Sequence, residues 1–147
     1  MTLTLAGRRL DAAYGEEVVA AAAREPRVTW IGALDRGRAK RLIADSAACL
    51  VPSAAEGGAN VVSEAIAAGT PVLCSDAPGN LGLLGADWPG AFQGGDVASC
   101  TRLLQRAASD PAFVDDLRTR TAAMQPMVAP AAELAAWRVL LDQLIPR

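Results

Sequence analysis

The sequence predicts an α/β fold in which a mostly parallel sheet lies between layers of helices, as a three-layer sandwich. Short apolar runs alternate along the chain with longer segments of helical periodicity, which is the pattern of successive βαβ units. The run over residues 48–51 is apolar at every position, as expected of a parallel strand that is covered on both faces. With 147 residues, 52% of them hydrophobic, the chain can build the core of one domain.

The individual elements follow in a regular order. Strands are predicted at residues 3–6, 28–31, 48–51, 71–75 and 90–92. Helices are predicted at residues 16–24, 36–47, 60–68, 97–108 and 131–144, and a further helix is predicted to begin at Pro111. Asn60 is the expected N-cap of the helix at 60–68, and Asp110 caps the helix that begins at Pro111. Residues 76–89 are rich in glycine and proline and are expected to form a loop.

One domain is predicted over residues 1–128, followed by a C-terminal helix over residues 129–147. The apolar stripe of that helix is expected to dock on the domain's own sheet, with packing against a neighbouring domain as the alternative. The stripe consists of Leu134, Trp137, Leu140, Leu141 and Leu144.

Composition excludes several classes of function. The net charge is −2 and the basic residues are scattered, so neither nucleic acid nor an anionic membrane is an expected partner. No apolar stretch approaches the roughly 18–20 residues of a membrane span, and no signal peptide is visible. Three widely spaced cysteines favour a cytoplasmic location. Without histidine or a close cysteine pair, no metal site and no His-dependent triad is predicted.

Residues 55–70, AEGGANVVSEAIAAGT, concentrate the features of a binding site directly after the third predicted strand. In open α/β sheets, ligands bind at the carboxyl ends of the strands. Gly57 and Gly58 allow positive φ and close approach of a ligand, and the N-terminus of the following helix favours a phosphate. Glu56 and Glu64 could each accept hydrogen bonds from the vicinal hydroxyls of a sugar.

Each of these carboxylates also has an ordinary structural interpretation. Glu64 could be a solvated helix residue that interacts favourably with the helix dipole, and Glu56 could hold a turn. Their combination with the glycines favours binding of a nucleotide-activated sugar. A dinucleotide oxidoreductase is excluded, because no GxGxxG motif follows the first strand.

This region resembles the Glu-x7-Glu signature of retaining family 4 glycosyltransferases, which have the GT-B fold of two facing Rossmann-like domains. The matching residues run from Pro52 to Ala65, and the likeness continues through Ala68-Gly69-Thr70-Pro71-Val72 and Ser75-Asp76. Nearly the whole chain is similar to the C-terminal, donor-binding half of such an enzyme. The strings EGGANVVSEAIAAGTPVL and PGNLGLLGADWPGAF further resemble selenosugar synthases of selenoneine biosynthesis, apart from Trp88 where tyrosine is expected.

The resemblance implies roles for named residues. Glu64 would hold the ribose hydroxyls of UDP, and Glu56, as the catalytic residue, would orient the hexose. The sugar or diphosphate would meet the backbone at Gly57, Gly58, Ala59, Asn60 and Val61. Uracil would lie against the backbone between Gly32 and Leu34. The UDP-sugar is a substrate, and no cofactor is implied.

The implied reaction is displacement of UDP from UDP-N-acetylglucosamine by selenophosphate, followed by loss of phosphate. Backbone N–H groups at Gly79, Asn80, Leu81 and Gly82 could hold the anionic nucleophile, although glycine and asparagine here could simply shape a turn. A general family 4 hexosyltransferase and a non-catalytic Rossmann-like binding module are the alternatives.

The resemblance also implies an N-terminal acceptor domain and an Arg/Lys pair that neutralises the departing diphosphate, and this chain contains neither. Arg8, Arg9 and Lys40 could substitute for that pair, but ordinary surface roles are expected of them. The isolated chain is therefore predicted to bind UDP weakly and to have little or no activity.

Overall fold

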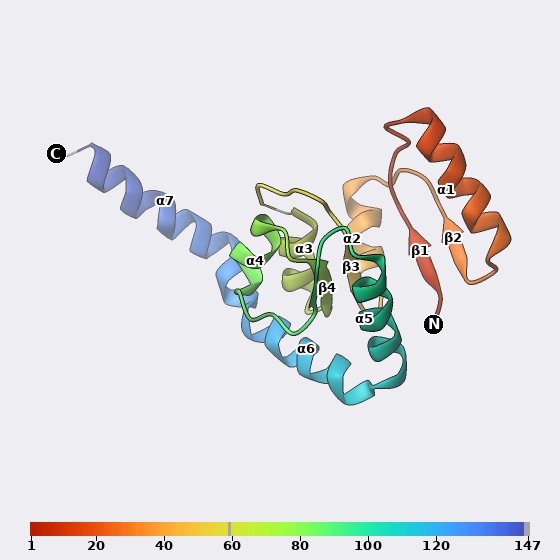
Figure 1. The fold of residues 1–147 in the computed structure, drawn as a ribbon. Coiled ribbons are helices and arrows are strands. Elements are labelled where there is room, and N and C mark those ends of the chain that lie inside the picture. Colours follow the sequence, from red (N-terminus) through yellow and green to blue (C-terminus); the bar gives the residue numbers. More distant parts are fainter. Residues whose placement is uncertain (59, 146–147) are drawn as a thin grey trace. The chain divides into compact units, whose positions relative to one another are not determined.

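The structure, a computed structural model, describes residues 1–58 and 60–145 and confirms the predicted Rossmann-like alternation of strands and helices (Figure 1). Within these residues the strands, all paired in parallel, are β1 (Leu3–Leu5), β2 (Val28–Trp30), β3 (Cys49–Val51), β4 (Val72–Ser75) and β5 (Ala91–Phe92). The helices are α1 (Ala12–Arg24), α2 (Arg36–Ala44), α3 (Asn60–Ala68), α4 (Pro78–Leu84), α5 (Val97–Ser109), α6 (Pro111–Ala123), the 3₁₀ helix η1 (Gln125–Val128) and α7 (Pro130–Leu144).

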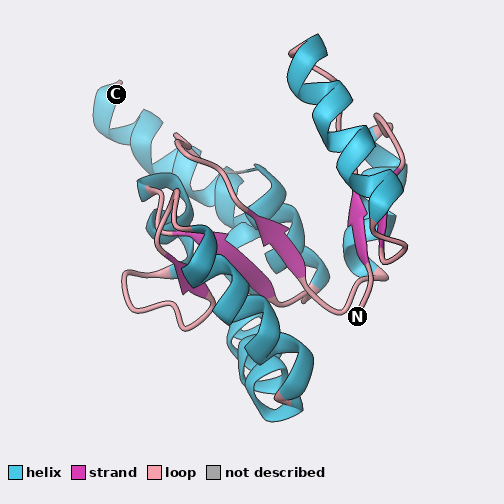
Figure 2. Cartoon of the chain, turned by 45° about the vertical axis from the view of Figure 1, so that its right-hand side comes forward, coloured by secondary structure: helices cyan, strands magenta, loops and turns pink. Residues whose placement is uncertain are grey.

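The strands form two small sheets instead of the single predicted one (Figure 2). One sheet pairs β1 with β2, and the other has the order β3–β4–β5. The chain correspondingly divides into two compact units, the first over Met1–Leu42 and the second from Ile43 onward. The predicted domain over residues 1–128 and the separate helix over residues 129–147 stay predictions.

In the first unit, helix α1 begins four residues earlier than the sequence predicted. Asp11 caps it: the side-chain Oδ1 accepts the backbone N–H of Tyr14 at 2.8 Å. An aspartate at this position satisfies one of the otherwise unpaired N–H groups of the first turn. The cap therefore fixes the helix start at Ala12.

Arg9 of the first unit packs between α1 and β2. Its guanidinium lies 4.6 Å from the centroid of the Trp30 ring, which is a cation–π contact. A Cβ atom at Gly15 would come within 2.9 Å of the Arg9 side chain, so glycine makes this packing possible. Arg9 is thus engaged within its own unit.

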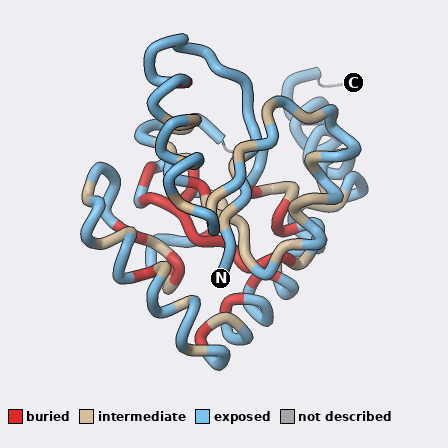
Figure 3. Tube along the Cα trace, turned by 90° about the vertical axis from the view of Figure 1, so that its right-hand side faces the viewer, coloured by how far each residue is buried: buried red, intermediate tan, exposed pale blue. Residues whose placement is uncertain are grey.

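The core of the second unit is built around β4. All of its residues are buried, and since successive side chains of a strand point to opposite faces, both faces of this strand are covered. Ile66 of α3 and Leu117 of α6 are fully buried in the same hydrophobic cluster. Figure 3 shows these buried segments in red.

Trp88 fastens the segment between α4 and β5 onto the sheet. Its side chain is buried, and the indole N–H donates to the backbone carbonyl of Val72 at 2.9 Å. A Cβ atom at Gly90 would lie 2.3 Å from the same carbonyl oxygen, so the chain passes too close to β4 for any larger residue. The tryptophan that departs from the expected tyrosine therefore has a structural role.

Helix α4 is a correction to the loop predicted over residues 76–89. Pro78 occupies the first turn, where a missing N–H costs nothing, and Leu84 is buried. The N–H groups of Asn80 and Leu81 both donate to the carbonyl of Ala77. Burial of one apolar side and a proline at the start thus outweigh the low helix propensity of the glycines.

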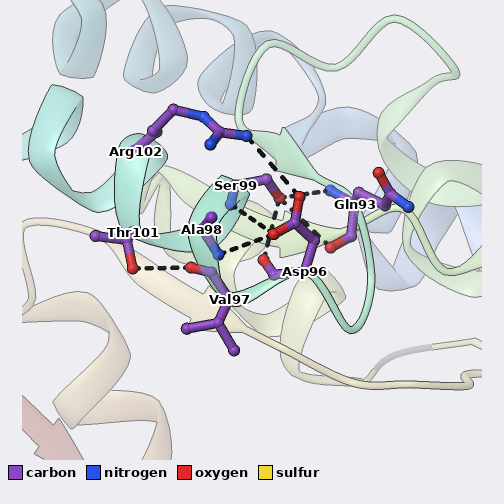
Figure 4. Close-up of polar contacts among 7 residues, drawn as sticks. All are labelled: Gln93, Asp96, Val97, Ala98, Ser99, Thr101 and Arg102. Atoms are coloured by element: carbon purple, nitrogen blue, oxygen red, sulfur yellow. Dashed lines mark hydrogen bonds and ion pairs between the residues drawn. The ribbon is translucent and has the colours of Figure 1, made fainter.

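The N-terminus of α5 is closed by protein groups (Figure 4). Asp96 Oδ1 accepts the N–H groups of Ala98 at 2.8 Å and of Ser99 at 3.1 Å. The hydroxyl oxygen of Ser99 in turn accepts the N–H of Gln93 at 3.1 Å. Because Asp96 already supplies the negative charge, this helix start is a structural cap and not a place for an anionic ligand.

The stripe of α7 does not dock on the sheet, contrary to the first expectation. No residue described in this helix is buried, and Trp137 and Leu144 are 53% and 68% exposed. Packing against a neighbouring domain stays a prediction. Among the described residues, no helix has both the length and the apolar content that crossing a bilayer needs.

Candidate functional site

The loop that carries Glu56 follows β3, and it is tied to the end of the neighbouring strand β4. The hydroxyl of Ser75, the last residue of β4, donates to the carbonyl of Ser53 at 2.5 Å. Both strands run in the same direction, so both of these residues lie at the carboxyl edge of the sheet. This edge is where open α/β sheets bind ligands.

The Glu56 carboxylate is held in place by a neighbouring side chain. The Ser53 hydroxyl donates to Glu56 Oε1 at 2.6 Å, and both side chains are half-buried. An ionised carboxylate offers about four acceptor positions, and Ser53 occupies one of them. Glu56 is therefore oriented by the protein while it keeps acceptor capacity for the hydroxyls of a ligand.

Gly79 of α4 packs directly beneath this loop. A Cβ atom at this position would lie 2.3 Å from the Glu56 carbonyl oxygen and 2.9 Å from the Glu56 Cβ. The first turn of α4 can approach so closely only because residue 79 is glycine. The structure thus brings together Glu56 and the Gly79 segment, which the sequence had placed in separate roles.

Asn80 lies in the interior of the second unit. It is fully buried, and its Nδ2 donates to both the carbonyl and the hydroxyl oxygen of Ser75, each at 3.1 Å. Its backbone N–H and that of Leu81 are used within α4. These two residues of the proposed nucleophile loop therefore belong to a helix and a buried network, and their amides do not face a ligand. Gly82 is exposed on the same helix.

Glu64 lies on α3, four residues or about 6 Å along the axis from the first helical residue, Asn60. Its side chain is half-buried. The pKa of the Cys49 thiol is raised to about 11, first by burial and then by the negative charge of Glu64. The carboxylate therefore lies close enough to β3 for its charge to act on that strand.

The glycines between the two carboxylates are open to solvent. Gly57 and Gly58 are exposed, and an added Cβ atom would meet nothing within 4 Å at either position. Neither glycine has a positive φ, although glycine would permit one. No neighbouring group of the described residues therefore requires glycine here, and the backbone is open to a ligand.

The remaining predicted contacts of the donor lie at the helix entrance. Asn60 is exposed and is the first residue of α3 instead of its cap, and Val61 is 42% exposed. Ala59 lies outside the described residues. The exposed residues at the start of α3 contrast with the start of α5, whose first N–H groups are taken by a protein carboxylate.

Gly32 and Leu34 belong to the first unit. Gly32 has a φ of +74°, and its carbonyl accepts the N–H of Gly7 at 2.9 Å. Leu34 is half-buried, and Asp35 caps α2 by accepting the N–H of Arg38 at 2.9 Å. One backbone acceptor of the predicted uracil contact is therefore already used. The predicted contact of uracil with the backbone between Gly32 and Leu34 stays a prediction.

Sequence reasoning did not find Ser53 and Ser75 as partners of this site. The available signals were a serine ending a buried strand and an asparagine within the apolar string PGNLGLL. Neither signal identifies a partner, since the bond from Ser75 to the Ser53 carbonyl connects residues that are 22 positions apart.

Comparison with known proteins gives one family match for this chain. The family model described as "Glycosyl transferases group 1" matches residues 1–123, which include both glutamates and end with the last residue of α6. The search of curated proteins finds no match. Since the family model covers well over half of the sequence, this chain belongs to the group 1 glycosyltransferases.

Proposed function

We propose that the chain binds a UDP-sugar at the entrance of α3, with Glu64 on the ribose hydroxyls and Glu56 on the hexose. The observation that carries this proposal is the fixed Glu56 carboxylate, held by Ser53 at the carboxyl edge of the sheet beside an exposed glycine pair. Glu64, half-buried one turn into α3, adds a second carboxylate on the helix that follows the Glu56 loop.

The first turn of α3, where Asn60 and Val61 are exposed, is the proposed contact for the diphosphate. Backbone N–H groups there carry the positive end of the helix dipole, which favours phosphate oxygens. The bare backbone at Gly57 and Gly58 allows the donor to approach without a steric clash. Glu56 and Glu64 would then bind the two sugars on either side of the diphosphate.

For the reaction, we propose that UDP-N-acetylglucosamine reacts with selenophosphate. Selenium would attack the anomeric carbon, the bond from that carbon to the UDP oxygen would break, and UDP would leave with the electron pair. Water would then cleave the phosphorus–selenium bond, releasing phosphate and leaving a seleno-sugar. This substrate pair is supported by the likeness of the two sequence strings to selenosugar synthases. The backbone amides of Asn80 and Leu81 add no support, because they donate within α4 and do not face a nucleophile.

Calorimetric titration of UDP tests the donor site. Glu64→Gln should weaken UDP binding by about 1–3 kcal/mol, because a neutral amide accepts hydrogen bonds less strongly than a carboxylate and cannot replace both of its acceptor sites. Glu17→Gln, an exposed change on α1, is the matched control and should leave the affinity unchanged. An unaltered dissociation constant for Glu64→Gln would show that Glu64 does not bind the ribose hydroxyls.

Product analysis tests the chemistry. The natural protein, with whatever sequence adjoins this chain, should be incubated with UDP-N-acetylglucosamine and selenophosphate and analysed by mass spectrometry for a selenium-containing sugar. Sugar transfer only to an alcohol acceptor would instead identify a general hexosyltransferase. Failure to bind any nucleotide-sugar would favour a non-catalytic module.

A further inference from the structure

We infer that Asn80 is a positioning residue for Glu56, acting from the interior of the protein without touching the donor. The inference rests on the proposed function, because it assigns Glu56 to the sugar. Asn80 is fully buried, and its side chain connects α4 to the end of β4. The positioning acts through Ser75 and Ser53, and in parallel through Gly79.

The first route is a chain of hydrogen bonds. Asn80 Nδ2 donates to the hydroxyl oxygen of Ser75 at 3.1 Å, and that hydroxyl donates to the Ser53 carbonyl at 2.5 Å. The Ser53 hydroxyl then donates to Glu56 Oε1 at 2.6 Å. Because Ser75 and Asn80 are both fully buried, water does not compete for the bond between them. The Ser53 backbone then joins the carbonyl that Ser75 holds to the hydroxyl that orients the half-buried Glu56.

The second route is steric. Gly79 precedes Asn80, and its Cα is so near the Glu56 backbone that an added Cβ would lie 2.3 Å from the carbonyl oxygen. The position of the first turn of α4 therefore limits where the Glu56 loop can lie. Asn80 holds this turn in position, since its Nδ2 also donates to the Ser75 carbonyl at 3.1 Å.

The orientation of the Asn80 amide follows from chemistry. The backbone carbonyl of Ser75 can only accept, so the amide nitrogen must face it. This leaves the buried Oδ1 without a donor among the described residues. Buried acceptors that lack a partner are uncommon in native proteins. The position therefore uses an amide for its two donated bonds although its oxygen stays unsatisfied.

The hydrogen bonds described above lead to Glu56. Glu64 lies on α3, which is seated by fully buried Val62 and Ile66 in the hydrophobic core. Loss of the Asn80 bonds should therefore disturb recognition of the sugar while recognition of UDP is retained. General destabilisation would instead lower the apparent affinity for both ligands by the same factor.

The test uses Asn80→Leu in the natural protein, since leucine has a similar volume and is compatible with an apolar surrounding. We expect the affinity for UDP-N-acetylglucosamine relative to UDP to fall about tenfold or more, with UDP affinity within about twofold of the parent. Ser53→Ala should act in the same direction. The double variant should lose less than the product of the two single effects, because both changes act on one carboxylate.

Thr121→Val provides the matched control. Thr121 is also fully buried and donates one hydrogen bond, to the carbonyl of Leu117 at 2.8 Å, but it lies on α6. Its replacement should leave the ratio of the two affinities unchanged. Should Asn80→Leu fail to fold, Ser53→Ala alone decides, and an unchanged ratio there overturns the inference.

Glu56→Gln separates the two proposals. A lowered ratio for Glu56→Gln together with an unchanged ratio for Asn80→Leu would overturn only the positioning role. An unchanged ratio for Glu56→Gln would overturn the proposed role of Glu56 and the inference with it.

Discussion

The two units of the chain differ in how they bury their sheets. In the first unit, over Met1–Leu42, no apolar side chain is buried, and Gly15 is the only buried residue. In the second, the whole of β4 is buried, with fully covered residues on α3 and α6. Parallel sheets are typically covered on both faces, and two strands with little cover are marginally stable. Glu56 and Glu64 therefore lie on the unit with the more deeply buried core.

Truncating one apolar side chain in each unit should give the largest difference. Leu117→Ala should lower the free energy of unfolding by about 2–5 kcal/mol, because it leaves a cavity in the core of the second unit. Val18→Ala, at a half-buried position of α1, should cost about 1 kcal/mol or less. Chemical denaturation measures both. Equal losses would show that the first unit has a core of comparable quality.

Two glycines of α4 in the second unit differ in the space around them. Gly79→Ala should destabilise the protein by about 1–3 kcal/mol, since the new methyl group would overlap the Glu56 backbone. Gly82→Ala, on the same helix with open space around it, should be neutral or stabilise by up to about 1 kcal/mol. Thermal unfolding of the pair tests this. Equal unfolding temperatures for the two variants would contradict the close packing of residue 79 against the Glu56 loop.

The smallest effect is expected at an exposed ion pair of the first unit. Hydrogen bonds from Arg27 lower the pKa of Glu25 from 4.5 to about 2. A lowered folded pKa contributes stability above the ordinary value, and that contribution is lost as pH falls from about 4.5 towards 2. Because the pair is exposed, the change in stability should be slight and weaken further with salt. NMR titration of Glu25, in the parent protein and in an Arg27→Gln variant, measures the pKa, and denaturation at several pH values measures the change in stability.

The sequence predicted the second unit well because its elements are apolar runs with clear ends. The predicted span 71–75 differs from β4 by one residue, and Pro111 behind Asp110 opens α6 as expected. Helix α4 was missed because glycines at positions 79 and 82 have loop composition. Its stability instead comes from burial of Asn80 and Leu84, which only the folded chain shows.

For the site, the sequence located the two carboxylates but not the groups that hold them. Ser53 could have been proposed, since it lies three residues from Glu56. The bond between Ser75 and the Ser53 carbonyl spans 22 residues and depends on the pairing of β3 with β4. Local patterns carry no information on such a contact, so this part of the site requires the structure.

The distribution of indole rings gives the molecule built-in optical reporters. The chain has three tryptophans: Trp30 in the sheet of the first unit, Trp88 buried against β4, and Trp137 largely exposed on α7. The arginine over Trp30, the backbone carbonyl at Trp88 and the solvent around Trp137 are three different surroundings for one chromophore. Replacing two of them with phenylalanine would leave a single emission band, so the melting of each region could be followed separately without an added dye.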